Sequence, residues 1–174
     1  MGPRLEFPSE KYVESFFGAK AEFVAEGLPG YHASIEREEF AAYLQRLHDH
    51  AAGKGLPEGY IASKEFWIID ADGYAGKIIL GLSYYPAPER VGHHVGYAVR
   101  PSKRGLGYAT RALHDLLSEA RKLGITKLMP SCGIANVASR RVIERNGGVL
   151  LPPLPHESIE DRELRFLIDL DLRS

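Results

Sequence analysis

Residues 95–109 read Val-Gly-Tyr-Ala-Val-Arg-Pro-Ser-Lys-Arg-Gly-Leu-Gly-Tyr-Ala. The apolar start predicts a strand over 93–99, which Pro101 ends because proline cannot donate a ladder hydrogen bond. Beyond the glycines, apolar residues recur with a helical period as far as Leu123, and Gly124 is typical of a helix C-terminus. The stretch therefore joins a strand to the N-terminus of the strongest predicted helix through a glycine-rich turn.

Such a turn favours the binding of an anion. Gly105 and Gly107 allow the backbone to turn sharply and to approach a ligand closely. The first N–H groups of a helix lack internal partners, and the helix dipole adds partial positive charge, so a phosphate or diphosphate fits there. Lys103, Arg104 and Arg111 are expected to add mobile positive charge nearby.

Two familiar phosphate motifs do not fit the turn. A Walker loop needs Gly-x-x-x-x-Gly-Lys-Ser/Thr, which the chain lacks. A dinucleotide fingerprint needs a third glycine where the chain has Thr110, and an acid about 20 residues on. The chain has Ile125, Thr126 and Lys127 in that region. Both readings are therefore disfavoured.

A third pattern fits. Arg104-x-x-Gly107-x-Ala109 resembles the Arg/Gln-x-x-Gly-x-Gly/Ala signature of the GNAT superfamily of N-acetyltransferases. The preceding strand, the long helix, Asn136-x-x-Ser139 and the turn Asn146-Gly147-Gly148 are similar to that superfamily too. The resemblance to the superfamily is specific over residues 65–150. Nearly the whole chain also resembles, more weakly, one subgroup of predicted bacterial acetyltransferases.

The resemblance implies an α/β (α+β) fold, in which helices flank a mixed central sheet that splays between strands four and five. The sequence pattern agrees. Strands over 65–70 and 77–85 surround the turn Asp70-Ala71-Asp72-Gly73, and Ser9 and Ser34 are expected to cap two helices before them. Further strands are expected at 125–129, 149–151 and 164–170, with a helix over 137–145. At 174 residues, one domain over 1–174 is expected.

The resemblance also implies acetyl-CoA as co-substrate. Its pantetheine arm would bond to the backbone of the strand before the turn, at Tyr97, Ala98 and Val99. Its diphosphate would lie on the N–H groups of the turn, from Arg104, Gly105, Leu106, Gly107, Tyr108 and Ala109. Asn136 and Ser139 match positions that approach the pantetheine and its phosphate.

Acetyl transfer to an amine needs an oxyanion donor, a base and a proton for the leaving thiolate. The Val99 N–H matches the family's oxyanion donor. The base position of some members falls on His93, and the adjacent His94 is the second candidate, because histidine titrates near neutral pH. Either histidine could instead be a structural residue bonded to backbone.

The general acid is unassigned. Many members carry a tyrosine four residues after the Ser139 position, where this chain has Ile143, and no tyrosine follows Tyr108. Cys132 is expected near the sulfur, either as a proton donor or, more ordinarily, as a small buried hydrophobe. The departure at Ile143 supports an alternative function, a catalytically silent acyl-CoA-binding module.

Composition and net charge disfavour several other classes of protein. A net charge of −1 disfavours a broad nucleic-acid footprint, and the apolar runs are too short for a membrane span. A single cysteine argues against a cysteine-rich zinc site and suits a reducing cytosol. We expect a cytoplasmic N-acetyltransferase with no metal, acting on a small-molecule or peptide amine; the sequence fixes neither the acceptor nor whether the chain forms a homodimer.

Overall fold

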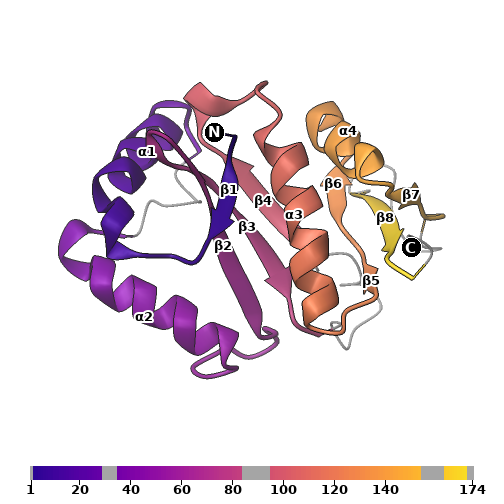
Figure 1. Ribbon diagram of the computed structural model, residues 1–174, viewed down its shortest axis with the longest axis horizontal. Helices are drawn as coiled ribbons and strands as arrows, with labels where there is room; N and C mark the ends of the chain where they lie inside the picture. Colours follow the sequence, from indigo (N-terminus) through magenta and orange to yellow (C-terminus); the bar gives the residue numbers. More distant parts are fainter. Residues whose placement is uncertain (1, 29–34, 84–94, 154–162, 172–174) are drawn as a thin grey trace.

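The computed structural model describes residues 2–28, 35–83, 95–153 and 163–171. Helices cover both faces of a first sheet, and a smaller second sheet lies beside it (Figure 1). The helices are α1 (Val13–Ala25), α2 (Phe40–Ala51), α3 (Tyr108–Lys122) and α4 (Val137–Arg145). Within the described residues, no helix is both long enough and apolar enough to cross a membrane.

The first sheet is antiparallel, in the order β1-β2-β3-β4. Its strands are β1 (Arg4–Glu6), β2 (Ser63–Asp70), β3 (Gly73–Gly81) and β4 (Val95–Val99). The predicted hairpin joins β2 to β3, and the Asp72 N–H donates to Asp70 Oδ1 at 2.8 Å in its turn. The register shifts between Ile68 and Ile69, which makes Ala75 the extra residue of a β-bulge in β3.

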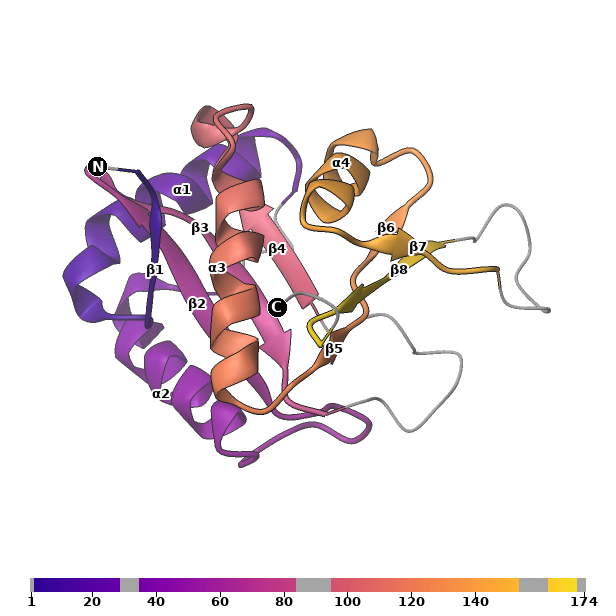
Figure 2. The same ribbon diagram turned by 45° about the vertical axis from the view of Figure 1, so that its right-hand side comes forward.

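The second sheet is built around the last strand, β8 (Glu163–Asp169). Three short strands each pair antiparallel with it: β5 (Lys127–Leu128), β6 (Ser131–Gly133) and β7 (Val149–Leu150). After the crossover through α3, β5 lies beyond β4 (Figure 2), but no pairing joins these two strands in the described residues. The expected splay between the fourth and fifth strands is therefore confirmed.

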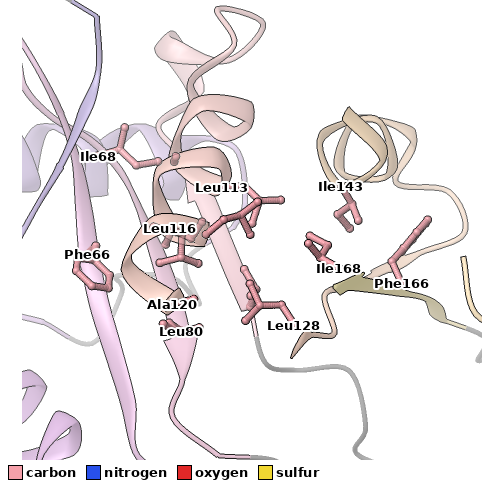
Figure 3. Close-up of a cluster of buried hydrophobic side chains, with 14 of the residues drawn as sticks. Phe66, Ile68, Leu80, Leu113, Leu116, Ala120, Leu128, Ile143, Phe166 and Ile168 are labelled. Atoms are coloured by element: carbon pink, nitrogen blue, oxygen red, sulfur yellow. The ribbon is translucent and has the colours of Figure 1, made fainter. Parts of the chain in front are cut away.

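Two apolar layers hold the helices against the first sheet. Successive residues of β2 point to opposite faces, so Phe66 and Ile68 pack towards α3 whereas Trp67 and Ile69 pack towards α1 and α2. The α3 layer continues into the second sheet (Figure 3), through residues that include Leu113, Leu128, Ile143, Phe166 and Ile168. The aromatic layer below α1 and α2 contains Phe16, Phe23, Phe40, Tyr43, Trp67 and Tyr74.

Most predicted elements are present, with shifted ends. Ser9 caps a 3₁₀ turn (Glu10–Tyr12) that leads into α1. The helix expected from Ser34 begins as α2 at Phe40, after a second 3₁₀ turn (Arg37–Glu39), and Ser34 itself lies outside the described residues. The strand expected over 77–85 begins earlier, at the hairpin turn, and ends at Gly81. The sequence did not predict β6, because three residues after a proline carry no periodicity.

Candidate functional site

The glycine-rich turn adopts the backbone that its sequence requires. A 3₁₀ turn (Pro101–Lys103) follows β4, and Gly105 and Gly107 then take positive φ values of 76° and 80°. No non-glycine residue of the described chain has a positive φ. A Cβ on Gly105 or Gly107 would meet open space, so these glycines are needed for backbone conformation rather than for room.

Most amides of this turn have no acceptor among the described residues. The Arg104 N–H donates to Pro101 O at 3.2 Å, and the Arg111 N–H donates to Gly107 O at 3.0 Å. Between them, the structure gives no protein acceptor to the N–H groups from Gly105 to Thr110 among the described residues. Gly107 is the N-cap of α3, so the positive end of the helix dipole adds to these open donors.

The long cationic side chains near the turn are already paired. Lys103 Nζ lies 2.8 Å from Asp70 Oδ2, and this contact raises the pKa of Lys103. Arg104 Nη1 donates to Glu26 Oε2 at 2.7 Å. Arg111 bonds to Asp115 on the exposed face of α3. The expectation of mobile positive charge is therefore wrong: the backbone, not the cations, offers the open donors.

Among the described residues, β4 pairs with β3 on one edge and with no strand on its other edge. Its Arg100 N–H donates to Ala75 O of β3 at 2.9 Å. Because backbone groups alternate in direction along a strand, those of Val99 and Tyr97 point away from β3 and those of Ala98 point towards it. The Val99 carbonyl fits this direction, since it accepts from Arg104 Nε at 3.1 Å. Of the three residues expected to bond to the pantetheine arm, only Tyr97 and Val99 therefore direct their backbone groups away from β3. The backbone groups of Ala98 point towards β3 and are not available for this role.

The side chain of Tyr97 joins β4 to the first turn of α4. Its hydroxyl lies 2.8 Å from Ser139 Oγ and 3.2 Å from Ser139 O. Burial raises the pKa of Tyr97 to about 12, although the hydrogen bond with Ser139 opposes this. Asn136 caps the same turn, because its Oδ1 accepts from the Ser139 N–H at 3.0 Å. The predicted residues Tyr97, Asn136 and Ser139 are therefore brought together.

Cys132 belongs to this group and also to the core. It is 6% exposed and is part of the apolar cluster around α3. Burial raises the pKa of its thiol, against a hydrogen bond with Ser139. Ile143 is completely buried in the same cluster, packed against Gly148. The position where many relatives have a tyrosine is thus filled by a packing side chain.

Two predicted residues cannot be placed. His93 and His94, the candidate bases, lie outside the described residues. Conversely, the acids that hold the turn, among them Glu26 and Asp70, were not predicted from the sequence as site residues. The described residues contain no group of three or more side chains suited to hold a metal ion.

A separate hollow of about 450 Å³ lies between α2, the segment that follows β1 and the strand β2. Its walls are mostly apolar, and they include Leu44, Leu47 and the buried Glu65. The carboxylate of Glu65 is already engaged by Tyr43, Trp67 and Lys77. Because β3 separates these strands from β4, this hollow is distinct from the glycine-rich turn.

Several solved structures share this fold. RimL, a ribosomal alpha-N-protein acetyltransferase in complex with coenzyme A, is 20% identical with a TM-score of 0.70, over 98% of this chain and 96% of that one. RimJ of Mycobacterium smegmatis, in complex with a CoA disulfide, is 17% identical with a TM-score of 0.72, over 97% and 82%. The microcin self-immunity acetyltransferase MccE, in complex with acetyl-CoA and AMP, is 15% identical with a TM-score of 0.68, over 97% and 92%.

Sequence comparison identifies the family. A search of curated proteins gives no match. The family model described as an acetyltransferase (GNAT) domain matches residues 5–149, which include β2, β3, β4, α3, the glycine-rich turn and α4. The chain therefore belongs to the GNAT acetyltransferase family.

Proposed function

We propose that this protein transfers the acetyl group of acetyl-CoA to a primary amine by direct attack on the thioester. The observation that carries the proposal is the run of open amides from Gly105 to Thr110 at the N-terminus of α3, next to the unpaired edge of β4. Among the described residues, neither these amides nor the N–H groups of Tyr97 and Val99 have a protein acceptor, and a diphosphate with an amide-bearing arm matches them in charge and in hydrogen bonding. The crystallised relatives in complex with CoA or acetyl-CoA support this ligand.

The diphosphate would lie on the amides of Gly105, Leu106, Gly107, Tyr108 and Ala109. Arg104 is removed from the expected set, because its N–H already donates to Pro101 O and its guanidinium to Glu26. The pantetheine arm would follow β4, bonding to Tyr97 and Val99. Its thiol end would then lie near Cys132, and the CoA–cysteine disulfide of the RimL structure supports a cysteine in that neighbourhood.

In the reaction, the amine nitrogen bonds to the thioester carbon, the C–S bond breaks and CoA leaves as a thiolate. The Val99 N–H, which points to the unpaired edge, would stabilise the oxyanion. The proton lost by the amine would pass to His93 or His94, which remain the candidate bases.

The paired hydroxyls of Tyr97 and Ser139 would protonate the thiolate in place of the tyrosine missing at Ile143. A pKa of about 12 keeps the Tyr97 phenol protonated at neutral pH, so this residue carries a proton before the reaction and cannot serve as the base. Its contact with Ser139 Oγ at 2.8 Å lets the two hydroxyls relay one proton. Tyr97→Phe with unchanged acetyl-CoA affinity and a fall in turnover would support this assignment.

Calorimetry tests the cofactor step. Wild-type protein should bind acetyl-CoA, and Gly107→Glu should abolish binding, because it strains the backbone at φ 80° and adds a negative charge beside the diphosphate. A wild-type protein that ignores acetyl-CoA would end the proposal.

A catalytically silent acyl-CoA-binding module is the second candidate, favoured by Ile143. Release of free thiol in the presence of amines separates the two, since a binding module gives none above hydrolysis. Peptides with a free N-terminal serine should be assayed first, beside their N-acetylated forms, because one similar structure is described as modifying the N-terminal serine of a ribosomal protein.

A further inference from the structure

The segment from Arg100 to Tyr108, called here the loop segment, is held by carboxylates from two distant elements. On one side is the last part of α1, which lies next to the loop segment (Figure 1). Both oxygens of Glu22 are engaged there: Oε1 accepts from Arg100 Nε at 2.8 Å and from Ser102 Oγ at 3.1 Å, and Oε2 accepts from the Ser102 N–H at 2.9 Å.

On the other side is the turn between β2 and β3. Asp70 Oδ2 accepts from Lys103 Nζ at 2.8 Å and from the Tyr108 hydroxyl at 2.9 Å. Its other oxygen accepts from the Asp72 N–H at 2.8 Å, which fixes the carboxylate within its own turn. The side chain of Asp70 is only 6% exposed, so its bonds are shielded from water.

These bonds hold the side chains of Arg100, Ser102, Lys103 and Tyr108 and leave the amides from Gly105 onwards without an acceptor among the described residues. Without them, a turn with two glycines would have many conformations, and fixing one residue costs about 1–2 kcal/mol of backbone entropy. A ligand that must order its own site binds more weakly than one that finds the site preformed. The carboxylates remove that cost before any ligand arrives.

We propose that Asp70 and Glu22 are positioning residues, which hold the loop segment in the conformation that receives the CoA diphosphate. The inference rests on the proposed function for its ligand, whereas the ordering of the loop segment itself is measurable without any ligand. Asp70 should matter most, because it is buried and joins Lys103 to Tyr108. Glu26 should matter least for the loop segment, because the side chains of Arg104 and Glu26 are 44% and 38% exposed. Exposed ion pairs contribute little to stability.

The test compares Asp70→Asn and Glu22→Gln with Glu14→Gln. Glu14 lies on the same helix as Glu22, is 79% exposed and pairs with Arg37, away from the loop segment. Calorimetry with CoA should show binding about tenfold weaker for the first two variants, which is ~1.4 kcal/mol. Glu14→Gln should stay within twofold of wild type. Thermal unfolding by circular dichroism confirms that each variant is folded.

A second measurement follows the loop segment itself in the absence of CoA. The heteronuclear NOE values of the Gly105 and Gly107 amides should fall in Asp70→Asn and Glu22→Gln, and should be unchanged in Glu14→Gln.

A double-mutant cycle then tests the contact between Lys103 and Asp70. Lys103→Met should weaken CoA binding as Asp70→Asn does, and the loss in the double variant should be smaller than the sum of the two single losses. Both changes remove the Lys103–Asp70 contact, although Lys103 also pairs with Asp72 and Asp70 also accepts from Tyr108.

The outcomes are distinguishable. A wild-type protein that does not bind CoA overturns the proposed function. Wild-type binding with unchanged affinity in both Asp70→Asn and Glu22→Gln overturns the positioning role alone, whatever the NOE values. An equal loss in Asp70→Asn, Glu22→Gln and Glu14→Gln also overturns it, because the effect would then be one of net charge.

Discussion

Gly76 of β3 lies opposite Val99 of β4, beside the bulge at Ala75. A Cβ there would overlap the carbonyl oxygen of Ala98, and the φ of 152° lies outside the range that side chains favour. The neighbouring Val99 is the expected oxyanion donor, so this close approach fixes the backbone of the site. The residue is thus required by the contact between two strands, not by a turn.

We predict that Gly76→Ala destabilises the fold by about 2 kcal/mol or more, because backbone must move to admit the methyl group. Urea denaturation measures this loss. Gly96→Ala is the matched control, since its Cβ meets nothing within 4 Å on β4. Equal stability of the two variants would contradict the prediction.

Cys132 allows a second prediction at this scale, because it is the one cysteine of the chain. Burial raises the pKa of its thiol, so less thiolate is present at a given pH than for a free cysteine. Alkylation by iodoacetamide, followed by mass spectrometry, should be slow near pH 8, faster at higher pH, and slower again with acetyl-CoA bound. Protein unfolded in urea gives the rate of the unprotected thiol; an equal rate in the folded protein would contradict the prediction.

Among the elements, α4 shows best what a sequence can and cannot specify. Its bounds, Val137–Arg145, are those predicted, because the cap, the periodicity and the closing glycines are all local signals. The contacts that tie elements together are not local. Glu22 and Arg100 are 78 positions apart, so no window of sequence reports that one holds the other. The open backbone of the turn was therefore predictable, and its carboxylate partners were not.

Asn146 makes another such contact between distant elements, because it joins the end of α4 to α3. It is 4% exposed, and its Nδ2 donates to Thr110 O at 3.1 Å and to Val142 O at 2.9 Å. We predict that Asn146→Leu costs about 1–3 kcal/mol, because the part-buried hydrogen bonds to the carbonyls of Thr110 and Val142 are lost. Thermal unfolding measures the loss. Arg140→Gln removes an exposed pair with Glu144 and should change stability by less than about 0.5 kcal/mol; a similar loss in both variants would contradict the prediction.

At the scale of the whole molecule, carboxylates join segments that are far apart in sequence, so stability should depend on pH. Burial alone would raise the pKa of Asp70, but hydrogen bonds from Lys103 and Tyr108 outweigh it and lower the pKa. The pKa of Glu22 is likewise lowered, because bonds from Ser102 and Arg100 outweigh its burial. Both carboxylates therefore hold their protons less tightly in the folded protein than in the unfolded chain.

These pKa shifts fix the direction in which stability changes with pH. The stabilisation by these groups is fully present above the unfolded pKa values, near 4, and is lost as pH falls through the lower folded values. Urea midpoints should be flat from pH 7 to about 5 and fall below that. In Asp70→Asn, the urea midpoint should fall less steeply below pH 5 than in the wild-type protein. A fall as steep as that of the wild type would contradict the assignment of this pH dependence to Asp70.

The pairing of three short strands with β8 has a consequence for synthesis on the ribosome. The chain emerges from its N-terminus, so β1 to β4 and α3 can assemble while residues 163–169 are still unmade. None of β5, β6 and β7 then has its partner strand. The nascent protein should expose the apolar residues that face β8, among them Leu128 and Ile143, until β8 is translated, and this is the interval in which a chaperone has most apolar surface to cover.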